Sequence, residues 1–181
     1  KRVAGGLLVV DAKVGRVRVK AVIDTGAERT LGNRALREAL YGPVDPNAPE
    51  RTQVFGATPD VARGHTVAAP PIVLGDATVN DVQVTYGDFH VFDVWGLREK
   101  PAVVIGMDVL SGLSVSLDFD HGVVLLWPTD FEPSASAGQI PIELDRVPFT
   151  AAQVCGRELR FLVASGCEYE LQLSRPLVDD L

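Results

Sequence analysis

One aspartate stands where an apolar run ends and a tight turn begins. The run is Ala21-Val22-Ile23, and Asp24-Thr25-Gly26 follows it directly. A carboxylate at the end of a buried strand is costly unless it is hydrogen-bonded or paired. Thr25 offers a hydroxyl and Gly26 an accessible backbone N–H that can hold it. The spacing therefore predicts a supported carboxylate at the edge of a core.

Two such carboxylates facing each other would share one proton, because both cannot ionise at close range. The pair would titrate as a unit. Its ionised member activates a water, and its protonated member polarises a carbonyl. A second copy of the Asp24 segment would therefore give the chain the chemistry of peptide hydrolysis without a covalent intermediate.

A later segment repeats the first, with alanine where the aspartate stood. The segment 161–167 reads Phe-Leu-Val-Ala-Ser-Gly-Cys. Aligning Asp24 with Ala164 makes a weak internal repeat. The alignment matches Thr25 with Ser165, Gly26 with Gly166, Glu28 with Glu168 and Leu31 with Leu171. We expect only the opening strands and the first turn of the second copy in this sequence.

Two more segments complete the pattern. A second apolar run, Val103-Val104-Ile105, leads into Gly106, and a hairpin with Gly56-Ala57-Thr58 at its tip lies between the two runs. With Asp24 to Ala27, these segments resemble a retropepsin-like aspartic peptidase, of the kind encoded in bacteria as well as in retroviruses. The resemblance covers roughly residues 3–127, and a partial second match runs over 139–171.

The resemblance implies roles for individual residues. Asp24 would be catalytic, Thr25 would brace two active-site loops against each other, and Gly26 would contact substrate through its backbone. Ala27 and Gly106 would support the active-site loop. A glycine at 106 lets its strand pass close beneath that loop, because it has no side chain.

The same resemblance gives a flap and an ion pair. Gly56, Ala57 and Thr58 would form a flap tip that closes over an extended peptide. Retroviral members often place a basic residue after the glycine that corresponds to Gly106. Here the polarity is reversed, and the hypothesis is that Arg29 pairs with Asp108.

The departure from the family pattern is Ala164, because a methyl group cannot share a proton. Ser165 keeps a hydroxyl at the brace position, and Gly166 completes the degenerate second site. Three explanations are open. The second copy is naturally inactive, or the position was changed to silence the enzyme, or two first lobes pair symmetrically in a homodimer and bring two Asp24 side chains together.

The prediction is an aspartic endopeptidase that hydrolyses extended peptide segments by water activated between two aspartates. Asp24 supplies one, and a homodimer partner or a complete second lobe supplies the other. The alternative is a catalytically inactive binding or scaffold module with the same fold. The expected partner is a protein or peptide substrate, and no cofactor is implied.

Short runs of Val, Ile and Leu, separated by Gly, Pro, Asn and Asp, predict an all-β fold. The expected architecture is a closed β lobe with a flap hairpin and one or two short helices, followed by the start of a degenerate repeat. We expect the lobe at 1–128, a linker at 129–138 and the incomplete repeat at 139–181. Expected strands are 5–10, 16–23, 51–55, 61–67, 70–74, 79–86, 103–105, 115–119, 123–127, 140–144, 149–154 and 159–163.

Other local patterns are less regular. Asn33 can cap a helix over 33–40, and 107–111 predicts a single helical turn. The segment 11–15 is expected to be a turn, and 87–100 an irregular stretch. Its aromatic residues are interpreted as core residues rather than as pocket lining: Phe89, Phe92 and Trp95.

Composition excludes several functions. The net charge of −7 leaves no basic stripe for nucleic acid and disfavours an anionic membrane surface. No apolar run is long enough to span a bilayer. The three histidines are scattered without metal-ligand spacing, so no metal is expected. Cys155 and Cys167 are interpreted as partly buried thiols rather than a disulfide. A periplasmic or cell-envelope location rests on the resemblance alone.

Overall fold

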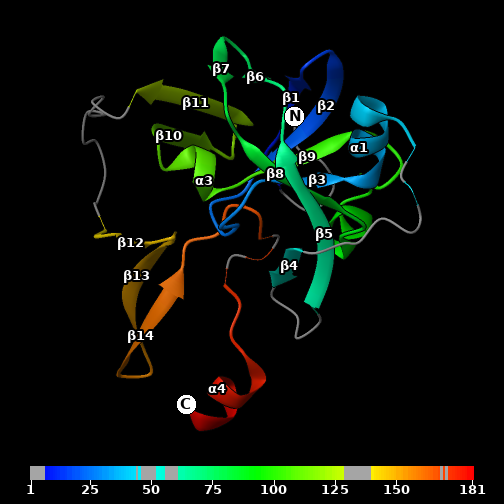
Figure 1. Ribbon diagram of the computed structural model, residues 1–181. Helices are drawn as coiled ribbons and strands as arrows, with labels where there is room; N and C mark the ends of the chain where they lie inside the picture. Colours follow the sequence, from blue (N-terminus) through cyan, green and yellow to red (C-terminus); the bar gives the residue numbers. More distant parts are fainter. Residues whose placement is uncertain are drawn as a thin grey trace.

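A long twisted sheet carries the first part of the chain, and a separate small sheet carries the last part (Figure 1). The computed structural model describes residues 7–43, 45, 52–55, 61–128, 140–167, 169 and 171–181. Its strands are β1 (Val9–Val14), β2 (Val17–Ile23), β3 (Leu31–Asn33), β4 (Thr52–Phe55), β5 (Val61–Ala68), β6 (Ile72–Leu74), β7 (Ala77–Val79), β8 (Gln83–Gly87), β9 (Ala102–Ile105), β10 (Leu113–Asp118), β11 (Val123–Pro128), β12 (Glu143–Asp145), β13 (Val147–Val154) and β14 (Arg157–Leu162).

The prediction of an all-β fold is confirmed. The described residues form sheets of nine, two and three strands. They also contain four short helices where one or two were expected: α1 (Arg34–Tyr41), α2 (His90–Val94), α3 (Met107–Leu110) and α4 (Arg175–Asp180). None of the described helices has the length and apolar composition that crossing a membrane requires.

The nine-stranded sheet has the order β4-β5-β8-β3-β9-β2-β1-β6-β7. β9 lies between β2 and β3, parallel to the first and antiparallel to the second. All four of its residues are buried. A strand with neighbours on both edges and both faces covered favours a continuous apolar sequence. This explains why the run ending at Ile105 shows no polar alternation.

Asn33 connects this sheet to α1. Its side-chain oxygen accepts the backbone N–H of Leu36 at 2.8 Å, which confirms the predicted cap. Its amide nitrogen donates to the carbonyl oxygens of Leu97 and Lys100, both at 2.7 Å. The buried side chain thus ties the start of α1 to the chain that enters β9.

Two sequence expectations are wrong in detail. The segment 11–15 is not a turn, because β1 continues to Val14 and turns only at Gly15 (φ +56°). Asp11 and Lys13 face solvent while Ala12 and Val14 are buried, so the polar residues belong to an amphipathic strand. The expected strand 79–86 is interrupted near Asp81 (φ +59°) and becomes β7 and β8.

The aromatic stretch contains the short helix α2 rather than irregular chain alone. Its aromatic side chains form a second core cluster with Leu7, Val9 and Val22. Phe89, Phe92 and Trp95 are all buried, which confirms their interpretation as core residues. Both cysteines are free, and Cys155 is exposed rather than partly buried.

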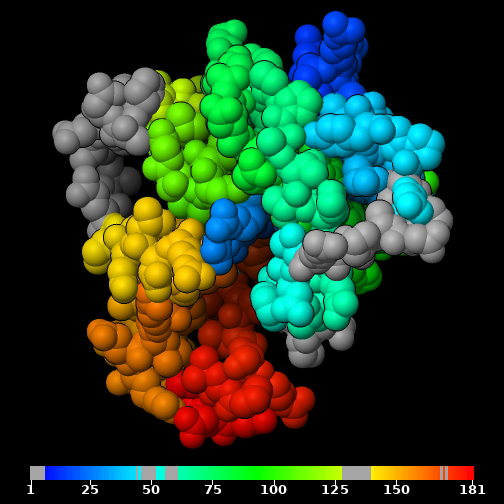
Figure 2. Space-filling model, viewed as in Figure 1, coloured from blue at the N-terminus to red at the C-terminus, as the bar shows by residue number. Residues whose placement is uncertain are grey.

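The last part of the chain repeats the first hairpin in the same register. Val9 pairs with Val22 in the first copy, and Phe149 pairs with Leu162 in the second. The hairpin turns also correspond, because Val154 pairs with Arg157 where Val14 pairs with Val17. The structured copy extends beyond the expected first turn and ends in α4. This helix corresponds in sequence position to α1 of the first copy. Figure 2 shows this repeat, yellow to red, beside the lobe.

Candidate active site

The two copies meet through a reciprocal set of hydrogen bonds. The Thr25 hydroxyl donates to the carbonyl oxygen of Val163 at 2.6 Å and accepts the backbone N–H of Ser165 at 3.1 Å. The Ser165 hydroxyl donates to the carbonyl oxygen of Ile23 at 2.8 Å and accepts the backbone N–H of Thr25 at 3.0 Å. Each loop therefore uses one hydroxyl to satisfy two backbone groups of the other.

This junction brings both copies to the Asp24 carboxylate. Its Oδ1 accepts the backbone N–H of Gly26 at 2.8 Å and that of Gly166 at 3.1 Å. The backbone N–H of Asp24 donates to the carbonyl oxygen of Ile105 at 3.1 Å. The carboxylate is thus held by one N–H from its own loop and one from the repeat, while β9 fixes its backbone.

The fit leaves no room for side chains at the two glycines. A Cβ at Gly166 would lie 2.3 Å from Cγ of Asp24. A Cβ at Gly26 would lie 2.8 Å from Cβ of Ala164. The methyl group of Ala164 therefore stands at the Asp24 loop, where the repeat would present a second aspartate.

Burial raises the pKa of the Asp24 carboxyl above its ordinary value. The N–H groups of Gly26, Gly166 and Ala27 favour the ionised form and oppose this shift with smaller effects. A carboxyl that holds its proton to higher pH can donate it to a substrate carbonyl under mildly acidic conditions.

The segment β9–α3 supports the Asp24 loop from below. A Cβ at Gly106 would lie 2.6 Å from the carbonyl carbon of Arg29 and 2.9 Å from the carbonyl oxygen of Ala27. The backbone N–H of Met107 donates to that Ala27 oxygen at 2.8 Å. The approach predicted for Gly106 is present in the structure, and only glycine fits it.

The proposed ion pair between Arg29 and Asp108 is wrong. The Asp108 carboxylate accepts the backbone N–H of Thr30 at 3.0 Å and its hydroxyl at 2.7 Å. Arg29 points outward, with Nε 3.8 Å from the Glu28 carboxylate. The buried Thr30 was missed by the sequence analysis, because a threonine before an apolar residue carries no distinctive signal. Its partner lies far along the chain.

The flap assignment is only partly described. β4 and β5 pair antiparallel, with Thr52 opposite Gly64 and Phe55 opposite Val61, as a flap hairpin requires. The expected tip at Gly56, Ala57 and Thr58 lies outside the described residues, and so does the expected linker at 129–138.

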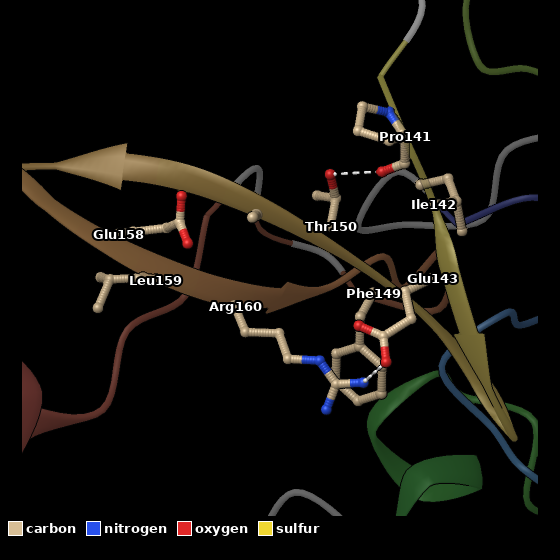
Figure 3. A pocket seen from close by; sticks show the side chains of 9 residues that line it. Pro141, Ile142, Glu143, Phe149, Thr150, Glu158, Leu159 and Arg160 are labelled. Atoms are coloured by element: carbon tan, nitrogen blue, oxygen red, sulfur yellow. Dashed lines mark hydrogen bonds and ion pairs between the residues drawn. The ribbon is translucent and has the colours of Figure 1, made fainter.

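A concavity of about 460 Å³ lies on the second hairpin, away from Asp24 (Figure 3). The guanidinium of Arg160 covers the Phe149 ring at 3.8 Å from its centroid and contacts the Glu143 carboxylate at 3.2 Å. These two charged groups neutralise each other, and the concavity contains none of the residues that meet around Asp24. We therefore place the candidate active site at Asp24. The concavity is lined by Pro141, Ile142, Glu143, Phe149, Thr150, Ala151, Glu158, Leu159 and Arg160.

The chain is similar to one protein family and to several solved structures. The sequence profile of aspartyl proteases matches residues 10–109, which include Asp24 and Gly106. No curated protein matches the chain. A retropepsin-like aspartic protease from Rickettsia conorii is similar in structure, with 17% identity and a TM-score of 0.48, over 69% of this chain and 85% of that one.

The retroviral protease-like domain of Ddi1 from Leishmania major is also similar, with 17% identity and a TM-score of 0.42, over 72% of this chain and 98% of that one. The family profile spans more than half of the chain and includes the strands and loop that hold Asp24. On that match, the chain belongs to the aspartyl protease family.

Proposed function

We propose that this protein carries the active centre of an aspartic endopeptidase, built from two segments of one chain, the Asp24 loop and the loop around position 164, and that Ala164 leaves this centre without its second carboxylate. The observation that carries this proposal is the reciprocal bonding of Thr25 and Ser165, two residues separated by 140 positions. It places the two loops face to face without a second chain. The substrate is an extended peptide, as the family membership favours.

Hydrolysis needs two carboxylates around one water. Asp24 supplies one, braced by the N–H groups of Gly26 and Gly166. Position 164 is where the other belongs, and its alanine leaves the centre with half of its acid–base pair. A second candidate function follows from that methyl group, namely binding of an extended peptide without cleavage.

A homodimer that brings two Asp24 loops together meets a structural obstacle. The hydroxyl of Thr25 already bonds to the Ser165 loop of its own chain. A second Asp24 loop would have to displace Ser165, whose hydroxyl has two partners of its own. The intramolecular arrangement is therefore the better-supported assembly.

The test is cleavage of an unfolded protein substrate between about pH 4 and 7, since a carboxylate pair titrates as a unit and its activity depends on pH. We expect no cleavage by the protein as it stands. Ala164→Asp should raise the cleavage rate by about 100- to 10,000-fold, the usual contribution of a positioned acid–base group. Adding Asp24→Asn to that variant should abolish the gain.

Ala164→Asn is the matched control, because it adds the same volume without an ionisable group. A folded Ala164→Asp protein that binds peptide but cleaves no faster than the asparagine control would support the binding function instead. Cleavage by the unaltered protein that Asp24→Asn abolishes would instead establish pairing of two Asp24 loops between chains.

A further inference from the structure

A row of threonine hydroxyls crosses the strands at one end of the nine-stranded sheet, β4, β5 and β8 (Figure 1). The hydroxyl of Thr66 in β5 lies 2.8 Å from that of Thr52 in β4 and 2.7 Å from that of Thr85 in β8. We propose that Thr66 is a positioning residue, whose hydroxyl fixes the hairpin β4–β5 against the sheet that carries the Asp24 loop. The effect of this position on a bound peptide rests on the proposed function, whereas its effect on the hairpin does not.

The strand register places these side chains on one face. Thr66 lies directly opposite Thr85 in the antiparallel pair β5–β8. Thr52 lies opposite Gly64, two residues before Thr66, so its side chain is a diagonal neighbour of Thr66 on the same face. Thr66 therefore stands between the outer strand of the hairpin and the strand against which the hairpin lies.

The backbone pairing of β5 changes partner along its length. Residues 61–64 pair with β4, and residues 65–68 pair with β8. The two backbone ladders meet between Gly64 and His65, so the hairpin can tilt about this junction. The contact between Thr52 and Thr66 crosses the junction, because Thr52 belongs to the first ladder and Thr66 to the second. It therefore opposes the tilt.

Burial of Thr85 gives the Thr66 hydroxyl its second role. Thr85 is 4% exposed, and among the described residues Thr66 is the partner of its hydroxyl. Without the Thr66 hydroxyl, the observed hairpin position would bury the Thr85 hydroxyl against an apolar surface, which is costly. Tilting the hairpin away would let water replace the lost partner. The Thr66 hydroxyl therefore stabilises the observed position relative to a tilted one.

The other contacts on this face of the hairpin are apolar or sterically close. Val54 and Ala62 are partly buried against the second core cluster. Gly64 lets β5 approach its neighbours, since a Cβ there would lie 2.7 Å from the carbonyl oxygen of Tyr86 and 3.0 Å from Cζ of Phe89. Apolar contacts have no directional preference. The hydroxyl row therefore supplies the directional contact across the junction.

β8 connects this row to the support of the Asp24 loop. The N–H of Thr85 donates to the carbonyl oxygen of Thr30 at 3.2 Å. The hydroxyl of Thr30 accepts the N–H of Gly106 at 3.2 Å and donates to the Asp108 carboxylate at 2.7 Å. Because Gly106 passes beneath the Asp24 loop, the hairpin and the loop are held by one connected set of residues.

The first experiment measures hydrogen exchange of the hairpin amides by NMR in the whole protein. Thr66→Val keeps the shape of the side chain and removes its hydroxyl. It should speed exchange at residues 52–55 and 61–64 about five- to tenfold, as expected when a buried hydroxyl loses its partner. Thr66→Ser keeps the hydroxyl and should restore the exchange rates. Thr78→Val is the control and should change nothing, because Thr78 is exposed on β7 at the other end of the sheet.

Strand propensity alone predicts the opposite order of the two variants. Valine, like threonine, is β-branched and favourable in a strand, whereas serine is not β-branched. Faster exchange in Thr66→Ser than in Thr66→Val would therefore overturn the proposal.

A double variant tests the contact between the two hydroxyls directly. Thr66→Val with Thr85→Val removes both partners together and leaves no buried hydroxyl unsatisfied. It should therefore exchange more slowly than Thr66→Val alone. Additive effects of the two substitutions would show that the hydroxyls do not interact, and would also overturn the proposal.

A second measurement connects the hairpin to the peptide. In the Ala164→Asp variant, Thr66→Val should raise KM for the unfolded protein substrate about two- to fivefold and leave kcat unchanged, because fewer molecules hold the hairpin in the binding position. An unchanged KM, or a fall in kcat alone, would overturn the link to peptide binding. Absence of cleavage by Ala164→Asp would contradict the proposed function, and the exchange rates would still decide the role of Thr66.

Discussion

The hairpins β1–β2 and β13–β14 have the same register and the same turn position, yet they end in different environments. Ile23 and Val22 at the end of the first are completely buried. Val163 and Leu162 at the end of the second are exposed by a third or more. Both hairpins nevertheless lead into loops that bond to each other through Thr25 and Ser165.

This difference separates local from tertiary causes of structure. The strand pairing and the turn need only alternation and a permissive turn, and both copies have them. Burial needs β9 and α3, which have no counterpart among the described residues of the second copy. Substitutions at equivalent positions of the two hairpins should therefore change the free energy of unfolding by very different amounts.

The largest difference is expected between Ile23→Ala and Val163→Ala. Removing the buried Ile23 side chain should lower the free energy of unfolding by about 3 kcal/mol, because it leaves a cavity in the core. Removing the exposed Val163 side chain should change it by less than about 0.5 kcal/mol. Urea unfolding of both variants measures the two changes in the free energy of unfolding. Equal losses would show that the second hairpin is as well covered as the first.

Ser165→Ala should have the next largest effect. It leaves the N–H of Thr25 and the carbonyl oxygen of Ile23 without their hydroxyl partner, at a cost of about 2 kcal/mol. Ser174→Ala is the matched control, since that exposed serine makes no capping hydrogen bond in α4. Chemical shifts of the Thr25 amide should move in the first variant only. An unchanged stability for Ser165→Ala would mean that the two copies are held together elsewhere.

A smaller effect should depend on pH. Burial raises the pKa of Asp24 in the folded protein, so the folded state holds this proton more tightly than the unfolded chain does. The resulting stabilisation is full below about pH 4, the ordinary aspartate range, and is lost as pH rises through the folded-state pKa. Asp24→Asn lacks this loss, so its stability relative to the unaltered protein should increase with pH.

Asp118 provides a control of opposite sign. Hydrogen bonds from the backbone and side chain of His121 lower its pKa. Its contribution is present above the unfolded pKa and is lost as pH falls through the folded one. Unfolding midpoints of Asp24→Asn and Asp118→Asn between about pH 3 and 7 should therefore diverge from the unaltered protein in opposite directions. A parallel pair of curves would contradict the burial of Asp24.

The smallest effect is expected at Arg160 and its counterpart Lys20. Arg160→Ala removes the contact with the Phe149 ring and the pair with Glu143, worth together about 0.5–1 kcal/mol. Lys20→Ala removes only an exposed pair with Asp11 and should cost less. Thermal melts of the two variants compare them. A larger loss of stability in Lys20→Ala than in Arg160→Ala would show that the contact between Arg160 and the Phe149 ring does not stabilise the second hairpin.

Much of this arrangement could be predicted from local sequence. The apolar run before Asp24, the glycine after it and the run before Gly106 each carry a backbone requirement that few residues meet. Asn33 likewise combines a capping side chain with a following apolar period. The internal alignment of Asp24 with Ala164 also anticipated which loops would correspond.

Other features depend on partners far along the chain and had no local signal. The bonding of Asp108 to Thr30 is one, because an acidic residue near Arg29 suggested an ion pair instead. The helix α4 is another, since Pro176 and two aspartates obscure its relation to α1. The contact between Thr25 and Ser165 has no local signal either, and only the resemblance, which gives both hydroxyls a bracing role, anticipates it.

The contact between Thr25 and Ser165 has a consequence for folding. Each hairpin closes a short loop and can form early, but their junction requires closure of a segment of 140 residues. The entropy of that closure must be overcome before any hydroxyl bridges the loops. The active centre should therefore be among the last parts of the molecule to form, so that partly folded chains, whose own peptide segments are most accessible, carry two separate and inert halves of it.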